Sequence, residues 1–557
     1  MKSILEIIKI AEIPKPVIII YFVMAIVSSF FAVTPAQFFG FTISAISNGA
    51  NNGLIYDLIT KTTNLEPSSY NLAIAGIVLF FASSIVYILF RNFFCYIVVI
   101  IAQKIIINVR KKLFIKLTNI DFKEIIKMSK GDVIYTLMND TQRLEYIFER
   151  PFYTIFSDIF DFIFVVGFLL YIEPAVLLIL LITTPFIYIF SIKTARIQKQ
   201  TSANTQKADS KITVSIEQLL GGYETIKSFN AEAKEQERFN KLSDESYKNR
   251  KAGTKSLSIF MPIEGTLSTI GIALVLLYAV YQVSNHALAV GMIVVIADYS
   301  RKFYQPIRNI SNYLQVIQKA LVSIGKIIEF LSIKEEVQTS LLKKEIKYKD
   351  VPVVVNNLKI YLDEVELVKE ISFKCHKNEL ILIKGRSGSG KTSIIRAFVG
   401  LYKVSNGMIY INGIDINSYS NKELRAAISY CGQRTFLHDD TIINNILYPN
   451  SSRDLNGILA YLEKLNLKHL NIDETIGDDG NKLSGGEKSR MAFLRAVMKN
   501  SKILFLDEAT SALDKDNENI VIDLLQELKQ DGWAIIFCTH SNNEELINIA
   551  DKVVCMD

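Results

Sequence analysis

Long apolar stretches dominate the first half of the chain, whereas the second half alternates short apolar runs with polar ones. From Pro16 to Tyr56 the sequence holds no charged residue. A helix of about 20 residues rises about 30 Å, the thickness of the hydrocarbon core of a bilayer. The pattern therefore predicts six membrane spans, at residues 17–46, 71–90 (apolar again up to 101), 152–172, 175–192, 265–283 and 287–297.

Basic residues are concentrated before the first span, between the second and third spans, and between the fourth and fifth. Because basic segments stay on the cytosolic side, we expect cytosolic termini, two long cytosolic excursions and short outer loops. Helical periodicity within the excursions, as at Ile212, Ile216 and Leu220, indicates that the spans continue as helices into the cytosol. The alternative is a small independent domain in each excursion, but neither excursion shows a β-pattern.

Charged residues interrupt or border the apolar stretches at five places, namely Arg91, Asp158, Asp161, Glu264 and Asp298. Charge inside a membrane is costly and often marks a transport pathway. An acidic group that faces such a pathway would favour a cationic substrate. The alternative, which we favour, is that these residues lie near span ends or on helix extensions already in water.

The second half begins after a long helical pattern that runs from 299 to about 331. A charged linker at 332–350 follows, and after it strand-like and helical runs alternate, which predicts an α/β domain with a largely parallel core sheet. The expected strands are 353–355, 358–361, 371–373, 380–383, 408–411, 427–430, 503–506 and 534–538. The predicted fold is thus an all-α transmembrane domain at 1–331 followed by an α/β domain at 351–557.

Composition agrees with this division. Half of the 557 residues are hydrophobic, which is high for a soluble protein, and the net charge of +6 is small for the length and does not suggest a nucleic-acid partner. The five cysteines form no C-x-x-C pair, so neither a disulfide framework nor a zinc site is indicated. The first apolar run is too long for a cleavable signal and lacks a cleavage site.

One stretch in the second half carries phosphate chemistry. It fits G-x-x-x-x-G-K-[ST] between a strand and a helix, and consists of Gly385, Arg386, Ser387, Gly388, Ser389, Gly390, Lys391 and Thr392, with Ser393 next. Glycines let the loop's N–H groups reach phosphate oxygens, and the helix N-terminus adds partial positive charge. Lys391 would reach the β- and γ-phosphates of ATP, and the Thr392 hydroxyl would bind Mg²⁺.

Two further motifs support a nucleotide site. The run 503–506 ends in Asp507 and Glu508, where the first carboxylate would hold Mg²⁺ and the second would polarise an attacking water. Leu483 to Glu487 places Ser484, Gly485 and Gly486 at the start of a helical run, which favours anion binding. Each motif alone is weak, because buried strands often end in Asp and S-G-G also fits a plain helix cap.

Together these motifs resemble an ABC exporter half-transporter, in which a six-span membrane domain is fused to a nucleotide-binding domain. In that family 385–392 looks like Walker A, 503–507 like Walker B, Glu508 like the catalytic glutamate and 483–487 like the LSGGQ signature, with Glu487 in place of Gln. The resemblance also assigns Gln433 as the Q-loop glutamine, which serves catalysis and Mg²⁺, and 441–446 as the stretch that follows it. It further assigns Asp514 to the D-loop, His540 as the switch histidine and Tyr361 as the aromatic that stacks on adenine.

The resemblance implies a mechanism. A single chain holds one P-loop and one signature, and in this family the signature of one copy closes over the P-loop of the other. The chain is therefore expected to act as a homodimer, or with a related half-transporter, on ATP with Mg²⁺. Coupling regions near 131–140 and 221–232 would carry closure to the spans.

Substrate and rival functions stay open at this point. The spans are built mainly of large apolar residues, so we expect a hydrophobic or amphipathic cargo such as a lipid, a drug-like molecule or a peptide. An ATP-gated channel or regulator without pumping is the alternative, and the fused order argues against an importer. No Cys/His peptidase domain precedes the first span, and the compact layout fits a bacterial inner membrane with a cytosolic nucleotide domain.

Overall fold

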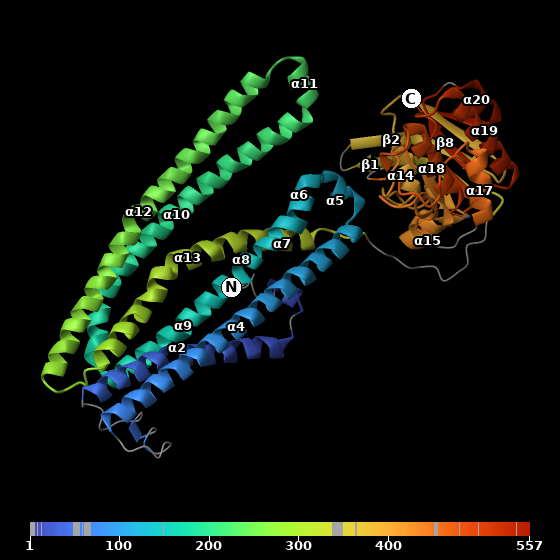
Figure 1. Cartoon of the computed structure of the whole chain (residues 1–557). Helices are drawn as coiled ribbons and strands as arrows, with labels where there is room; N and C mark the ends of the chain where they lie inside the picture. Colours follow the sequence, from blue (N-terminus) through green and yellow to red (C-terminus); the bar gives the residue numbers. More distant parts are fainter. Residues whose placement is uncertain are drawn as a thin grey trace. The chain divides into compact units, whose positions relative to one another are not determined.

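The computed structural model describes most of the chain and divides it into two compact units (Figure 1). The described residues are 6–7, 9–12, 14–47, 56–57, 60, 68–148, 150–336, 349–362, 365–449, 455–477, 480–499, 501–541 and 543–556. The helical unit comprises Met1–Thr118 and Ser129–Ile333, and the α/β unit comprises Asn119–Met128 and Lys334–Asp557.

Long helices form the helical unit. They are α2 (Lys15–Ile46), α4 (Ser69–Asn119), α9 (Arg150–Ile172), α10 (Pro174–Gly221), α12 (Glu232–Ser284) and α13 (Met292–Ser332). Pro16 lies in the first turn of α2, and α10 begins with Pro174; proline suits the first turn because its missing N–H would have no partner there. Within the described residues, five helices are long and apolar enough to span a membrane, namely α2, α4, α9, α10 and α12.

The sixth predicted span, 287–297, does not form a separate helix. Its second part begins α13, where Asp298, Arg301 and Lys302 follow within a few residues and lower the apolar character. The helix α13 nevertheless belongs to the bundle, since Tyr299 is fully buried and its hydroxyl donates to the carbonyl oxygen of Val33 on α2 at 3.1 Å. The all-helical, six-helix domain that the sequence predicts is therefore present.

The bundle packs around one apolar cluster to which five helices contribute, including Val165, Leu180, Val275 and Phe303 from α9, α10, α12 and α13. Large apolar side chains also lie on the outer surface: Leu178 is 64% exposed and Leu277 69% exposed. Such faces are unfavourable in water but match the hydrocarbon of a bilayer.

Charged residues that border the spans contact polar partners, and of these residues Asp158 and Glu264 are buried whereas Arg91 is exposed. Asp158 accepts hydrogen bonds from Gln305, at 3.2 Å, and from Asn309 and Tyr313, all on α13. Lys302 pairs with Asp298 at 2.7 Å, Thr194 donates to Glu264 at 3.4 Å, and Arg91 donates to Tyr87 at 3.2 Å. One oxygen of Asp161 is buried without a hydrogen-bond partner among the described residues.

The second excursion continues the spans, as predicted. The helices α10 and α12 run side by side as a long pair (Figure 1) and are joined by the short helix α11 (Tyr223–Ser228). Ion pairs bridge the two, such as Arg250 to Asp209 at 2.6 Å and Lys211 to Glu245 at 3.0 Å.

The first excursion breaks into short elements: α5 (Phe122–Lys127), α6 (Lys130–Tyr135), a π-helical turn (Thr136–Asp140), α7 (Thr141–Arg143) and α8 (Glu145–Phe148). The coupling region predicted near 131–140 lies in the helical unit. The segment Asn119–Met128, just before it, instead belongs to the α/β unit. The predicted linker at 332–350 is described only at its two ends, and its middle lies outside the described residues.

The α/β unit holds two sheets. A four-stranded sheet has the order β2-β1-β4-β5 and is antiparallel, and a five-stranded parallel sheet has the order β6-β7-β8-β3-β9. The strands are β1 (Val353–Leu362), β2 (Val365–Cys375), β3 (Leu380–Gly385), β4 (Ile409–Ile411), β5 (Ile414–Asp415), β6 (Ser429–Cys431), β7 (Ile503–Asp507), β8 (Ala534–Thr539) and β9 (Lys552–Met556). The predicted strands 353–355 and 358–361 merge into β1.

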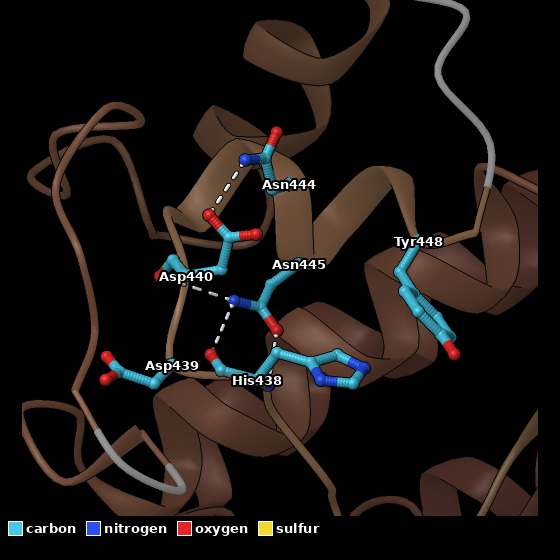
Figure 2. Close-up of a pocket in the computed structure, with 6 residues that line it drawn as sticks. All are labelled: His438, Asp439, Asp440, Asn444, Asn445 and Tyr448. Carbon is cyan, nitrogen blue, oxygen red and sulfur yellow. Dashed lines mark hydrogen bonds between the residues drawn. The ribbon is translucent and has the colours of Figure 1, made fainter. Parts of the chain in front are cut away.

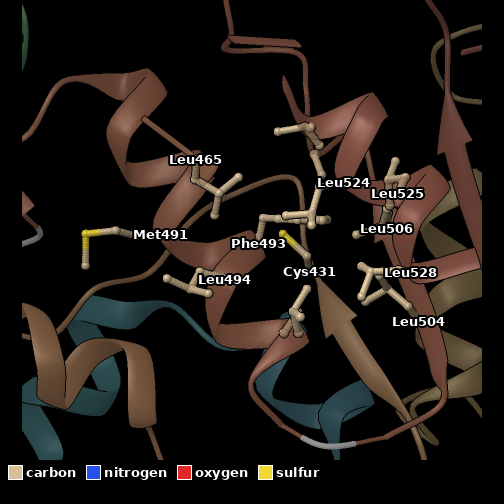
Figure 3. Close-up of a cluster of buried hydrophobic side chains, with 14 of the residues drawn as sticks. Cys431, Leu465, Met491, Phe493, Leu494, Leu504, Leu506, Leu524, Leu525 and Leu528 are labelled. Carbon is tan, nitrogen blue, oxygen red and sulfur yellow. The ribbon is translucent and has the colours of Figure 1, made fainter. Parts of the chain in front are cut away.

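The helices of the α/β unit cover its sheets. Besides α5, they are α14 (Lys391–Phe398), a 3-10 turn (Ile416–Ser418), α15 (Asn421–Ala427), α16 (Ile442–Leu447), α17 (Leu455–Lys464), α18 (Gly485–Val497), α19 (Lys515–Gln530) and α20 (Glu544–Ile549). Alternate residues of β7 reach different clusters. Leu504 and Leu506 join Phe493 and Leu525 on one face (Figure 3), and Phe505 stacks on Phe398 on the other, with ring centroids 4.4 Å apart. The central sheet is thus buried on both faces, as a parallel sheet requires.

Candidate functional site

The glycine-rich loop connects β3 to α14, which is the predicted context. Lys391, the first residue of α14, is 5% exposed, and its Nζ donates to the carbonyl oxygens of Gly385 at 2.7 Å and Arg386 at 2.9 Å. The ammonium group is thereby folded back over the loop that should hold the phosphates. A buried ammonium next to the N–H groups at a helix start is suited to bind an anion.

Two glycines of this loop have backbone conformations that disfavour other residues. Gly388 has φ +85°, with free space where a side chain would begin. Gly390 has φ +97°, and a Cβ there would lie 2.3 Å from the carbonyl oxygen of Leu367. The turn into α14 therefore depends on a residue without a side chain.

We expect Gly390→Ala to destabilise the protein by about 1–3 kcal/mol, because the left-handed conformation and the contact with Leu367 both oppose a Cβ. Thermal unfolding of the full-length protein would measure this loss. Gly388→Ala is the matched control, since it carries the conformational cost without the collision and should lose less. Equal losses in the two variants would contradict the role given to the collision.

Asp507 ends β7 and is 1% exposed. Neither of its carboxylate oxygens has a hydrogen-bond partner among the described residues. Burial raises the pKa of Asp507, and the Thr392 side chain and the cationic Arg396 and Lys391 oppose that shift. A buried carboxylate without donors is expensive, and a divalent cation held between Asp507 and Thr392 would satisfy it.

Glu508 brings three of the predicted residues together. Its Oε2 accepts a hydrogen bond from Gln433 Nε2 at 2.8 Å, its Oε1 contacts His540 Nδ1 at 2.9 Å, and Lys391 Nζ lies 3.9 Å from the same oxygen. The side chain is 12% exposed, and the backbone has φ +50°, a strained value for a residue other than glycine. Strain of this kind occurs where neighbouring structure fixes a functional side chain.

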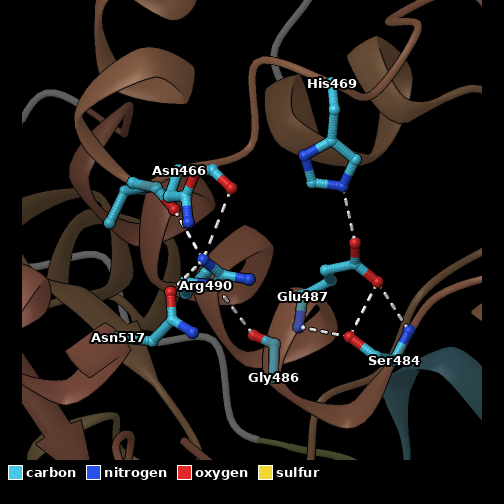
Figure 4. A network of polar contacts seen from close by, with 8 residues as sticks. Asn466, His469, Ser484, Gly486, Glu487, Arg490 and Asn517 are labelled. Carbon is cyan, nitrogen blue, oxygen red and sulfur yellow. Dashed lines mark hydrogen bonds and ion pairs between the residues drawn. The ribbon is translucent and has the colours of Figure 1, made fainter. Parts of the chain in front are cut away.

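The predicted signature forms a separate polar cluster (Figure 4). Ser484 caps α18, because its Oγ accepts a hydrogen bond from the backbone N–H of Glu487 at 3.3 Å. Glu487 Oε2 in turn accepts two hydrogen bonds from Ser484, one from its Oγ and one from its backbone N–H, each at 2.7 Å. The other oxygen of Glu487 contacts His469 Nε2 at 2.8 Å. Burial alone would raise the pKa of Glu487, but the hydrogen bonds from Ser484 and His469 outweigh it and lower that pKa.

Arg490 connects this signature cluster to the predicted D-loop. Its guanidinium donates to the carbonyl oxygen of Leu465 at 2.9 Å and to the side chain of Asn517 (Figure 4). Asn517 in turn donates to Asp514, which caps α19 by accepting from the Asn517 backbone N–H at 2.8 Å. Gly485 and Gly486 begin α18, so their N–H groups point out of its N-terminus.

The remaining predicted residues differ in exposure. Tyr361, on β1, is 49% exposed and donates to Glu366 at 3.2 Å, so its ring is available for stacking. Arg386 and Ser387 are exposed, Ser393 is half-buried on α14, and the hydroxyl of Ser389 is buried without a partner among the described residues.

The predicted residues therefore form two groups. Lys391, Gln433 and His540 each contact Glu508, and Asp507 precedes Glu508 in the chain. Ser484 and Asp514 belong to the other group, and within the described ranges no hydrogen bond or ion pair joins this group to the glycine-rich loop. Tyr361 contacts neither group through such a bond.

The sequence analysis missed Arg495, on α18, which holds the segment after Gln433. It also missed a pocket of about 330 Å³ beside that segment (Figure 2), lined by His438, Asp439, Asp440, Asn444, Asn445 and Tyr448. The stretch 441–446 is part of the family resemblance, but nothing in its local pattern identifies Arg495, about 50 residues away, as its contact.

Comparison with known proteins extends these observations. A family model described as the ABC transporter transmembrane region matches residues 18–307, and one described as ABC transporter matches 368–511. A computed superposition relates the chain to the structure of a bacterial Atm1-family ABC exporter with ATP bound, at a TM-score of 0.75 and 21% identity, covering 98% of this chain and 94% of that one. Because the two sequences are only 21% identical, this similarity supports the fold and nothing beyond it.

Curated relatives match over most of the chain. An ATP-dependent lipid A-core flippase of Haemophilus influenzae (strain 86-028NP) is 26% identical over 477 residues, which cover 82% of this chain and 79% of that protein. A protein of Bacillus subtilis (strain 168), named provisionally as the multidrug export ATP-binding/permease protein YgaD, is 25% identical over 475 residues, covering 82% and 80%.

Proposed function

Because the chain belongs to the ABC transporter family, in which a membrane region is fused to an ATP-binding domain, we propose that two copies bind ATP between them and export a hydrophobic or amphipathic substrate. The cluster in which Glu508 is held by Gln433 and His540 beside Lys391 carries the proposal. It places a carboxylate and an ammonium group at the end of the glycine-rich loop, which is the arrangement needed to cleave a terminal phosphate.

Different residues of the site would bind different parts of ATP. N–H groups of the loop and the start of α14 would hold the phosphates, Lys391 would exchange its two carbonyl contacts for phosphate oxygens, and Tyr361 would stack on the base. Asp507 and Thr392 would hold Mg²⁺, because the two carboxylate oxygens of Asp507 are buried without donors among the described residues. When bound, this ion would neutralise phosphate charge.

Glu508 is the proposed general base. It would polarise a water directed at the terminal phosphate, and its contacts with Gln433 and His540 would fix its orientation. His540 would also lie close enough to donate to the phosphate, because its Nδ1 already contacts the Glu508 carboxylate, which would face the phosphate.

A second copy is needed to complete the site. The signature residues Ser484 to Gly486 form no bond with the loop of their own chain in the part of the unit that the structure describes, yet the α18 N-terminus is suited to an anion. We propose that they close over ATP held by the partner's loop. A homodimer would then have two sites able to hydrolyse ATP, and a dimer with a related half-transporter would use the same surfaces.

Coupling to the membrane helices would begin at α5, which lies in the α/β unit and directly follows α4 in the chain. Its Phe122 ring packs on Tyr402, with centroids 5.9 Å apart, and the Arg396 guanidinium lies 5.6 Å from the Phe122 centroid. Because Arg396 belongs to α14, a shift of the glycine-rich loop on binding ATP would reach α5 through this contact. Backbone bonds from Asp121 to Lys334 at 3.1 Å and from Glu336 to Asn119 at 2.8 Å tie the same segment to residues 334–336, which follow α13 in the chain.

Phe122→Ala is expected to lower substrate transport severalfold while basal ATP hydrolysis remains. The substitution removes the ring and the cation–π contact, which is worth about 0.5–2 kcal/mol, but leaves the glycine-rich loop intact. Transport and ATP turnover measured on the same proteoliposomes would give the coupling ratio. Phe122→Tyr keeps the ring and serves as the control; an unchanged ratio in the alanine variant would remove α5 from this role.

The export function is tested by vectorial transport. Inside-out vesicles that contain the protein should accumulate a fluorescent lipid or amphipathic cation only with hydrolysable ATP, and the panel of cargoes that stimulates hydrolysis would define the substrate class. Curated flippase and multidrug-export relatives support both lipids and drug-like molecules as the first cargoes to try. Flux that runs down a gradient in both directions whenever ATP is bound would instead indicate a gated channel.

We also propose a bacterial inner-membrane location with the α/β unit in the cytosol. The basic excursions and the bacterial relatives support it. Accessibility of a cysteine placed on the exposed surface of the α/β unit, measured from each side of the membrane, would test the orientation.

A further inference from the structure

We propose that Arg495 is a positioning residue that ties the signature of each chain to its Gln433 segment, so that the two ATP sites of the dimer respond to each other. The inference rests on the proposed function, since it needs two copies that share their sites. It concerns a residue outside both groups of predicted site residues.

One end of the connection is the segment after Gln433, which has no regular secondary structure up to Asp440. The Arg495 guanidinium donates from Nη1 to the carbonyl oxygen of Phe436 at 2.8 Å and from Nε to the carbonyl oxygen of Asn445 at 2.8 Å. Its Nη2 also donates to Asn445 Oδ1 at 3.3 Å. The arginine therefore holds the backbone three residues beyond Gln433.

Asn445 continues this anchoring. It is 1% exposed, its Nδ2 donates to the carbonyl oxygens of His438 and Thr441 at 3.0 Å, and its Oδ1 accepts from the His438 N–H at 2.8 Å. Figure 2 shows its side chain directed between His438 and Asp440. Asn445 and Arg495 thus hold this segment together with the buried Leu437 and the backbone bond from the Ile476 N–H to the Asp440 carbonyl oxygen at 3.1 Å.

Aromatic rings complete the surroundings of the guanidinium. It lies 5.9 Å from the centroid of Tyr448, whose ring packs on His438 at 4.7 Å, and His438 packs on Phe436 at 4.8 Å. Burial lowers the pKa of Arg495, and at any ordinary pH the group stays charged. A planar cation with several fixed acceptors orients its neighbours more strictly than one hydrogen bond does.

The other end of the connection is the signature. Arg495 lies ten residues after Gly485 on the same helix, α18, which is about 15 Å along one rigid element. When Ser484 and the first N–H groups of α18 close on the partner's ATP, the helix moves as a unit. Through Arg495 this movement reaches Phe436 and then Gln433, which contacts Glu508 in the chain's own ATP site.

A coupling of this kind predicts cooperativity between the sites. The ATP dependence of hydrolysis by the full-length wild-type dimer in nanodiscs should give a Hill coefficient clearly above 1. Arg495→Met should bring it close to 1 and lower the maximal rate about tenfold, while the affinity for a fluorescent ATP analogue at one site stays within about twofold, since the variant leaves the glycine-rich loop unchanged. Arg495→Lys, which can satisfy only part of the acceptors, should fall between the two.

Mixed dimers distinguish coupling between the two ATP sites from an effect of Arg495 on the site of its own chain. In this mixed dimer one chain carries both Arg495→Met and Glu508→Gln, and the other chain is wild type. One hydrolytic site remains. Its Glu508 and Gln433 belong to the wild-type chain, and its signature belongs to the variant chain. We expect its turnover to be about tenfold below that of a dimer with Glu508→Gln alone. Lys468→Met, at an exposed lysine of the same unit, is the control and should have no effect.

The outcomes are distinguishable. Unchanged turnover in this mixed dimer, or an unchanged Hill coefficient in Arg495→Met, would overturn the role of Arg495 while leaving the exporter function intact. A wild-type protein that neither hydrolyses ATP nor dimerises on it would overturn the proposed function, and the inference with it. If Arg495→Met fails to fold, the same comparisons made with Arg495→Lys decide the question.

Discussion

Replacing Glu508 with Gln is expected to lower ATP turnover by about 10²- to 10⁴-fold, the usual contribution of a general base. The amide keeps the shape of the side chain and its contact with Gln433 but cannot accept a proton from water. ATP binding should persist, and the two copies should stay closed on it. Steady-state hydrolysis, together with the nucleotide retained after gel filtration, would measure both effects.

Glu544→Gln provides the control for this substitution, because Glu544 is an exposed carboxylate in the first turn of α20 of the same unit. It should hydrolyse ATP at the wild-type rate. Turnover that survives undiminished in Glu508→Gln would remove Glu508 from its role and would direct attention to another base near His540.

The second large effect is expected for Lys391→Met. The ammonium group is buried and turned toward the loop, so its loss removes a charge-assisted contact to phosphate and leaves the carbonyl groups of Gly385 and Arg386 without their donor. At about 1.5–3 kcal/mol for a hydrogen bond to a charged group, ATP affinity should fall by about 10- to 100-fold. Equilibrium binding of a fluorescent ATP analogue would measure it.

Lys422→Met, at an exposed lysine of α15, is the matched control and should bind ATP normally. Near-normal affinity in Lys391→Met would mean that backbone N–H groups alone hold the phosphates. A lower melting temperature without ATP would show that part of the loss is structural, because the ammonium group also closes the loop on itself.

The sequence predicted the parts of this molecule that depend on local pattern. The glycine-rich loop lies between β3 and α14 as expected, because the glycines and the flanking apolar run leave few other conformations. The family resemblance assigned Gln433 and His540 to the same site as Glu508, but their contacts with Glu508, 75 and 32 residues away, were not predicted. Five of the six predicted spans fall on helices whose length and apolar character suit a membrane, whereas the sixth, 287–297, covers only the start of α13, which becomes charged soon after.

Features that depend on contacts between distant residues had no local signal. Arg495 reaches acceptors 50 and 59 residues earlier in the chain, and one arginine in a helix does not indicate its partners. The membership of Asn119–Met128 in the α/β unit also follows from packing, because Phe122 contacts Tyr402 and Arg396. No periodicity in the sequence relates these three residues.

The cap of α18 has a consequence for how firmly two copies can hold ATP. The Ser484 hydroxyl already donates a hydrogen bond to the Glu487 carboxylate, a stronger acceptor than the side-chain amide of the glutamine in the LSGGQ signature. To bind a γ-phosphate, that hydroxyl must exchange one anionic acceptor for another. The net gain on closure is therefore a difference between two similar interactions, and the proposed dimer should reopen more readily than one whose serine is released from a neutral partner.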